Sequence, residues 1–95
     1  MFIGTYRFTG EPTELAAAYD RLMAKFPDDQ LLVHICVRTD EGPVVYDTCP
    51  SQAEFQAFST DPMVLAEMRE AGLPSPQVEQ VGEVHAAKAP ALVRN

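Results

Sequence analysis

The chain has 95 residues, of which 46% are hydrophobic and 22% charged, and its formal net charge is −7. A chain of this length forms one domain with a single modest core. Its acidic balance, with a pI of about 4.5, argues against nucleic acids and anionic membranes as partners, because both require clustered basic side chains.

The N-terminal stretch lacks the basic and apolar segments of a signal peptide, and no run approaches the roughly 18 apolar residues of a membrane span. We therefore expect a cytoplasmic protein. Cys36 and Cys49 are then expected to be free thiols, because disulfides are rare in a reducing compartment.

The first predicted elements are a strand and a helix. Residues 2–9 alternate large side chains with small or polar ones, which is typical of a half-buried strand. Pro12 suits a first helical turn, and the apolar stripe over residues 13–26 predicts an amphipathic helix. Pro27 and the acidic pair at 28–29 are expected to end this helix.

A hairpin follows. Residues 31–38 and 42–49 are rich in β-branched and apolar side chains, and the turn at 39–42 lies between them. This pattern predicts two antiparallel strands.

The last predicted elements are a divided helix and a strand. Ser51 is expected to cap a second helix. This helix should be kinked or split at Asp61-Pro62, because these residues are typical of a new N-cap and first helical turn. Gly72 is expected to end it. Residues 73–77 contain two prolines and predict a loop, and residues 78–87 alternate again as a fourth strand.

This order of elements predicts an α+β fold of the ferredoxin-like βαββαβ type. Its helices cover one face of a four-stranded antiparallel sheet. Residues 1–95 are expected to form this single domain, with 88–95 as a loose or dimer-wrapping tail. The other face of the sheet would be bare, and we expect a second copy of the chain to cover it.

The stretch EFQAFSTDPMVLAEM, residues 54–68, joins an aromatic helix to an Asp-Pro restart. In this stretch, and over nearly its whole length, the chain resembles the dimeric α+β barrel superfamily. That superfamily includes antibiotic-biosynthesis monooxygenases, stress-responsive barrel proteins, polyketide cyclases and many bacterial proteins of unassigned reaction. The resemblance implies a homodimer with a cofactor-independent site for a small organic, polyketide-like molecule. The chain has no Trp, whereas monooxygenases of this group often have one near their site. An acid–base cyclase or isomerase requires fewer special groups in its site than a monooxygenase does.

Strand parity sorts the candidate site residues, since residues two apart share a face. In the second strand a wholly apolar set suits the side under the helices: Leu31, Val33, Ile35 and Val37. The barrel-facing side would then carry His34, Cys36 and Arg38.

The other strands are less determined. Strand one would send Arg7 inward if its aromatic residues pack under the helices. Strand three presents either Tyr46 or Asp47 to the barrel, and the sequence does not decide between them, although Tyr46 is the more useful guess. In strand four the set that contains Glu83 and His85 is the preferred inward one.

A cavity lined by these side chains would hold His34 as the first general base and His85 as the second, with Tyr46 as a phenol donor. The expected substrate-binding residues are Arg7, Cys36, Arg38 and Glu83. No metal site is expected, because the two His and two Cys have neither CxxC nor HxxxH spacing.

The predicted function is acid–base chemistry of cyclase, isomerase or monooxygenase type, without a cofactor, on a small organic substrate. Each candidate also has an ordinary structural role, because a lone His in a strand more often serves the core or an interface. Two alternatives therefore stay open: a ligand-binding protein without chemistry, and a structural dimer whose interior is filled by side chains.

Overall fold

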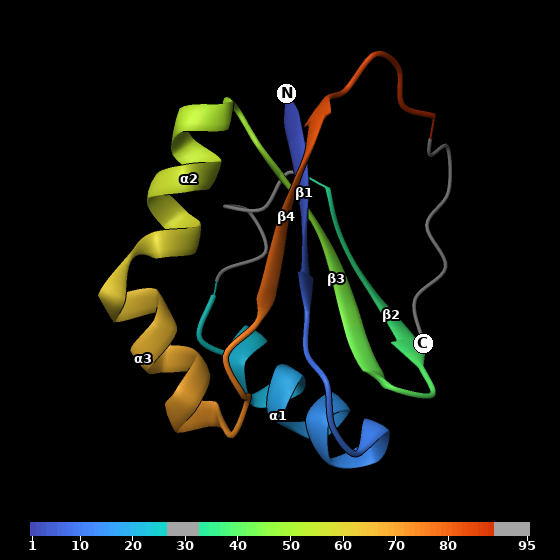
Figure 1. The fold of residues 1–95 in the computed structure, drawn as a ribbon, viewed down its shortest axis with the longest axis vertical. Helices are drawn as coiled ribbons and strands as arrows, with labels where there is room; N and C mark the ends of the chain where they lie inside the picture. Colours follow the sequence, from blue (N-terminus) through green and yellow to red (C-terminus); the bar gives the residue numbers. More distant parts are fainter. Residues whose placement is uncertain (27–32, 89–95) are drawn as a thin grey trace.

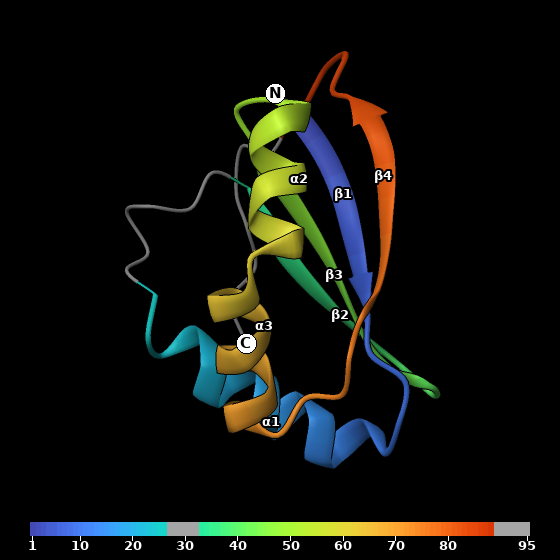
Figure 2. The same ribbon diagram turned by 60° about the vertical axis from the view of Figure 1, so that its left-hand side comes forward.

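A computed structural model describes residues 1–26 and 33–88. Within them the chain has an α+β fold with three helices on one side of a four-stranded antiparallel sheet of order β2-β3-β1-β4 (Figures 1 and 2). The elements are β1 (Phe2–Arg7), α1 (Pro12–Met23), β2 (His34–Thr39), β3 (Gly42–Cys49), α2 (Gln52–Thr60), α3 (Pro62–Ala71) and β4 (Gln77–Glu83). No helix in this part of the chain is long and apolar enough to cross a membrane.

Side-chain caps fix where the first two helices begin. Pro12 occupies the first turn of α1, as predicted, where its missing N–H has no partner to lose. The carboxylate of Glu11 accepts a hydrogen bond from the backbone N–H of Glu14 at 2.7 Å. At the start of α2 the hydroxyl of Ser51 accepts one from the N–H of Glu54 at 3.2 Å, which confirms the predicted cap.

The predicted break in the second helix is confirmed. Helix α2 ends at Thr60 and α3 begins at Pro62, and Asp61 between them has an extended backbone. The carboxylate of Asp61 accepts a hydrogen bond from the N–H of Met63 at 2.9 Å and so caps α3. Gly72 ends α3 in the left-handed conformation, with φ of 104°, as a glycine allows.

Three predicted strands differ in their bounds. Strand β1 ends at Arg7 rather than at residue 9. Strand β4 stops at Glu83 rather than at residue 87, because its neighbour β1 begins at Phe2, directly opposite Glu83. One further hydrogen bond, from the N–H of Val84 to the carbonyl of Met1 at 2.7 Å, extends the contact. Strand β2 begins at His34. The predicted helix stop at 27–29, strand residues 31–32 and tail residues 89–95 lie outside the described residues.

The core lies between the helices and one face of the sheet. Its buried members are Phe2, Tyr6, Phe8, Leu15, Ala18, Leu22, Val45, Phe55, Met68, Ala71 and Leu73. The aromatic residues of the first strand therefore pack under the helices, which is the condition under which Arg7 was predicted to lie on the other face. Gly4 lies among them because the ring of Phe55, which is fully buried, occupies the place where a Cβ would be.

Strand β2 presents the opposite faces from those predicted. Ile35 and Val37 lie on the face away from the helices, where they are 44% and 40% exposed. Cys36 packs against the core, and His34 contacts α1. His34 pairs directly with Asp47 of β3, so the two share one face of the sheet. The prediction was wrong because it assumed that the more apolar set must lie under the helices.

We define the open face as the sheet face away from the helices. It comprises Ile3, Thr5, Arg7, Ile35, Val37, Val44, Tyr46, Thr48, Gln77, Glu79 and Val81. Figure 2 shows that no described helix lies on this side. Several of its apolar side chains are well exposed, with Tyr46 at 40% and Val81 at 55%. The surface is therefore both apolar and uncovered in the single chain.

Candidate functional site

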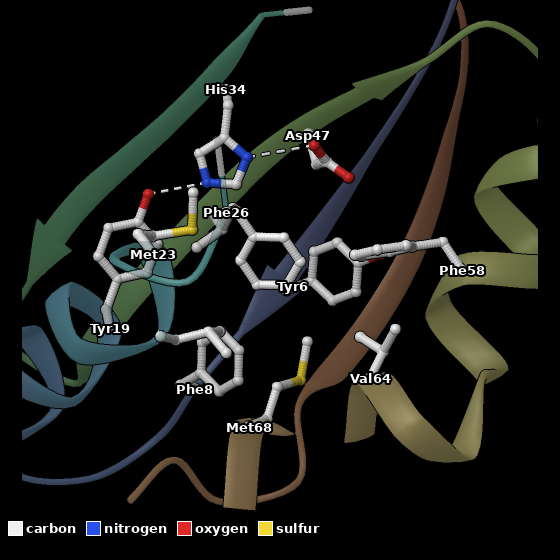
Figure 3. A pocket seen from close by; sticks show the side chains of 12 residues that line it. Tyr6, Phe8, Tyr19, Met23, Phe26, His34, Asp47, Phe58, Val64 and Met68 are labelled. Carbon is white, nitrogen blue, oxygen red and sulfur yellow. Dashed lines mark hydrogen bonds and ion pairs between the residues drawn. The ribbon is translucent and has the colours of Figure 1, made fainter. Parts of the chain in front are cut away.

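A cavity of about 60 Å³, partly open to solvent, lies between the sheet and the helices (Figure 3). Its lining residues are Tyr6, Phe8, Tyr19, Leu22, Met23, Phe26, His34, Val45, Asp47, Phe58, Val64 and Met68. Aliphatic side chains and aromatic rings form most of the cavity wall. The polar groups at its edge are few. Tyr19, His34 and Asp47 are hydrogen-bonded to one another, and Tyr6 contributes a separate hydroxyl.

His34 and Asp47 form the central pair of this site. They lie opposite each other on β2 and β3, and Nδ1 of His34 is 3.2 Å from Oδ1 of Asp47. Their side chains are only 14% and 11% exposed. A buried carboxylate requires hydrogen-bond donors, and the imidazole supplies one.

Tyr19 completes the chain of hydrogen bonds from α1. Its hydroxyl oxygen is 2.8 Å from Nε2 of His34, and the two rings stack with centroids 5.9 Å apart and planes at 17° (Figure 3). An ionised carboxylate can only accept, so we assign the imidazole proton to Nδ1, which donates to Asp47. Nε2 then accepts from the Tyr19 hydroxyl. Burial, followed by the charges of nearby residues, raises the pKa of Tyr19 above its usual range, so the phenol keeps its proton.

Tyr6 contributes a hydroxyl of a different kind. Its side chain is buried, and within residues 1–26 and 33–88 its hydroxyl has no hydrogen-bond partner. Burial, and then the charges of Asp47 and Cys49, raise the pKa of Tyr6 above its usual range, so this phenol also stays neutral. In Figure 3 its ring lies between those of Phe26 and Phe58.

The two cysteines flank the site as free thiols. Sγ of Cys49 lies 3.9 Å from Oδ2 of Asp47, at the limit of a weak hydrogen bond that the thiol donates. Burial, and next the charge of Asp47, raises the pKa of the Cys49 thiol from 9.0 to about 11. Burial also raises the pKa of Cys36. Both thiols are therefore protonated at neutral pH, which makes them poor nucleophiles.

Two residues named from the sequence lie elsewhere, on the open face. Arg7 and Tyr46 border a shallow hollow of about 390 Å³ together with Glu79. Of the two alternatives that the sequence left open for strand three, Tyr46 is therefore the one on the face away from the helices. His34 lies on the other face of the sheet, so Tyr46 and His34 do not share a cavity.

The remaining named residues lie apart from both hollows. Arg38 is exposed near the end of the hairpin, opposite Pro43. A register shift in β4 places Glu83 opposite Phe2 instead of on the face of Glu79, and its carboxylate accepts a hydrogen bond from the N-terminal amine at 2.7 Å. His85 is exposed beyond the end of β4. The single cavity that was predicted to join these side chains is not formed by the described chain.

Sequence reasoning missed three members of the site. Tyr19 was visible as part of the apolar helix stripe, and Asp47 as one of two possible inward residues of strand three. Tyr6 was assigned to packing alone. The signal that links them is the pairing of His34 with Asp47, which depends on the hairpin register.

Among the described residues no group of three or more His, Cys, Asp or Glu side chains could hold a metal ion. Comparisons of this chain with models of protein families, with curated proteins and with solved structures found no match.

Proposed function

We propose that the protein binds a small, largely apolar organic molecule in the cavity and moves a proton on it, with His34 as the general base. The observation that carries this proposal is the chain of hydrogen bonds from Tyr19 through His34 to Asp47 at the edge of the cavity. A carboxylate behind a histidine fixes the imidazole tautomer and stabilises the imidazolium that forms when it takes a proton. Among the predicted reactions, those of the cyclase or isomerase type need no more than this.

The proton can pass through Tyr19. As a C–H bond of the substrate breaks, its proton moves to the Tyr19 oxygen while the Tyr19 proton moves to Nε2 of His34. The electron pair of the C–H bond stays on the substrate as an enolate or similar anion, and the new imidazolium is held by Asp47 at 3.2 Å. Return of the proton to a different atom completes an isomerisation, and attack of the carbanion on a second group of the same molecule gives a ring.

Proton transfer can be tested before the natural substrate is known. The protein is incubated in D2O with a panel of small carbon acids, namely ketones, nitriles and thioesters, and NMR measures the rate at which deuterium replaces their acidic hydrogens. Removing a positioned general base lowers a rate by about 10²- to 10⁴-fold, so His34→Gln should abolish the exchange. Asp47→Asn should lower it, because the amide no longer fixes the tautomer.

The same assay distinguishes the two histidines named from the sequence. Loss of exchange in His85→Gln together with full exchange in His34→Gln would refute the proposed base. Wild-type protein that exchanges no member of the panel above the buffer rate would refute proton transfer altogether. Circular dichroism of each variant shows that the fold is retained.

We also propose that the chain is a ferredoxin-like member of the dimeric α+β barrel superfamily and that two copies pack open face to open face. The strand order β2-β3-β1-β4 and the helices on one side support the fold assignment. The exposed apolar side chains of the open face support the pairing. Its charged residues, Arg7 and Glu79, have opposite signs, so two copies with a net charge of −7 each can meet there without strong local repulsion.

Sedimentation equilibrium at micromolar concentration tests the dimer. Ile35→Lys places a charge on the open face, beside Tyr46, and should give monomers. Met63→Lys places the same charge on α3, where the side chain is 76% exposed, and should leave the dimer intact. A monomeric wild-type protein, or a dimer that Met63→Lys breaks and Ile35→Lys does not, would overturn the pairing.

The volume of the cavity favours a second candidate function. Ligand pockets commonly measure about 300–1,000 Å³, whereas this cavity measures about 60 Å³. A dimer whose subunits are simply filled, with His34 and Asp47 as a structural pair, fits that size. It predicts that no probe molecule shifts the NMR signals of Tyr19 or His34.

A further inference from the structure

The Tyr6 hydroxyl is the starting observation. Within the described residues it is the one buried side-chain N or O atom without a hydrogen-bond partner. Tyr6 nevertheless borders the same cavity as His34 and Asp47. A phenylalanine would pack against Phe55 equally well, since the ring contact, with centroids 5.5 Å apart, needs no oxygen. The oxygen is therefore not explained by packing.

The hydroxyl can be satisfied by a ligand. A neutral phenol offers one O–H donor, so the complementary group is an oxygen or nitrogen acceptor. The ring of Phe58 borders the cavity next to Tyr6 and is 36% exposed. Rotation of a partly exposed side chain is fast, and rotation of Phe58 is the movement by which we expect a small group to reach the Tyr6 oxygen.

The charge of the ligand follows from the lining. Asp47 brings a negative charge to the cavity wall, and no Lys or Arg is among the described residues that line it. A buried anion would therefore lack a counter-ion and meet a like charge, which is costly in a medium of low dielectric constant. The ligand group is accordingly uncharged.

The size of the cavity limits the group that enters. A cavity of about 150 Å³ lined by apolar side chains accommodates benzene. By proportion, about 60 Å³ accommodates roughly two to three non-hydrogen atoms, which is the size of one carbonyl group and one neighbouring carbon.

We propose that the group bound in the cavity is the uncharged carbonyl of a ketone or a similar carbonyl compound, and that Tyr6 donates a hydrogen bond to its oxygen. This inference rests on the proposed function and specifies its substrate class. It makes Tyr6 a residue that selects the ligand, while His34, through the Tyr19 hydroxyl, removes a proton from the carbon next to the carbonyl. A hydrogen bond to the oxygen also stabilises the enolate that forms when that carbon loses its proton.

Three probes of nearly identical shape test the proposal: acetone, acetate and 2-methylpropene. Each has four non-hydrogen atoms, and they differ in the group that would face Tyr6. Binding is followed through backbone amide NMR shifts of residues that line the cavity, in the wild type and in Tyr6→Phe. We expect acetone to bind the wild type and to bind Tyr6→Phe about fivefold more weakly or worse, the usual effect of one lost hydrogen bond. The binding of 2-methylpropene should be equal in both proteins, and acetate should not bind.

Three results would overturn the inference. They are equal acetone affinity in wild type and Tyr6→Phe, acetate binding as tight as that of acetone, and no acetone binding to the wild type at any soluble concentration. Failure of the proposed function is separate. If acetone binds in a Tyr6-dependent way but its methyl hydrogens do not exchange in D2O, the proposed ligand class is supported. The proposed role of His34 as a general base is then refuted.

Discussion

Removing the Tyr6 oxygen should make the protein more stable. A buried polar group without a partner costs about 1–3 kcal/mol, and no group within the described residues satisfies this hydroxyl. Tyr6→Phe keeps the ring and its contacts with Phe55. The void left by one oxygen, about 10 Å³, costs only about 0.2 kcal/mol at about 24 cal/mol per Å³. We expect the free energy of unfolding to rise by about 1 kcal/mol.

The assay is urea unfolding followed by circular dichroism at neutral pH and at one fixed protein concentration, because a dimer makes apparent stability depend on concentration. A gain of about 1 kcal/mol corresponds to a rise of about 4–8 °C in Tm for a domain of this size. Tyr46→Phe is the matched control. Its hydroxyl lies on the open face, where the residue is 40% exposed in the single chain. At a protein concentration low enough to keep the chain monomeric, the change should stay within about 0.5 kcal/mol.

A loss of about 1 kcal/mol or more in Tyr6→Phe would refute the reasoning, because it would mean that the hydroxyl makes a favourable hydrogen bond in the folded protein. A gain in stability joined to a loss of acetone affinity is the informative combination. It would show that the Tyr6 hydroxyl lowers the stability of the fold but increases the affinity for the ligand, as residues of binding sites often do.

Three further outcomes are expected. Histidine-ring NMR should show the His34 proton on Nδ1, and Asp47→Asn should increase the population of the tautomer that carries it on Nε2. A wild-type ring protonated on Nε2 would contradict the assigned tautomer. Gly4→Ala should cost at least about 3 kcal/mol in urea unfolding, because its Cβ would overlap the ring of Phe55 and overpacking is costly; near-wild-type stability would show that the ring can move. Stability should also fall between pH 9 and pH 11. The folded state raises the pKa of the Cys49 thiol from 9.0 to about 11, so it binds that proton more tightly than the unfolded state does, and the stabilisation present below pH 9 is lost as the pH rises through 11. Cys49→Ala should make the fall in the urea midpoint shallower, and an unchanged slope would contradict the assignment.

Much of the fold follows from short stretches of sequence. The break between α2 and α3 was predicted because Asp61 and Pro62 act on the backbone next to them, and Gly72 ends α3 by its own conformation. The bounds of β3 followed from the turn before it. Each of these signals works within a few residues, so no distant part of the chain has to be known.

The faces of the strands do not follow in the same way. Alternation shows that His34 and Cys36 share a face, but it cannot say which face lies under the helices, because both orientations keep the same period of two. In β2 the more apolar set, with Ile35 and Val37, turned out to lie on the open face. The polar set is tolerated inside because Tyr19 and Asp47 satisfy His34 there.

The sequence by itself thus determined the order of elements, the caps of α2 and α3, and which residues of a strand share a face. Only the tertiary structure decided that His34 meets Asp47 and Tyr19, that Tyr46 and Arg7 lie on the other side of the sheet, and that the Tyr6 hydroxyl is enclosed. The physical reason is range. Caps and turns are local hydrogen-bond problems, whereas a site assembled from β1, α1, β2 and β3 depends on strand register and on how a helix packs across the sheet.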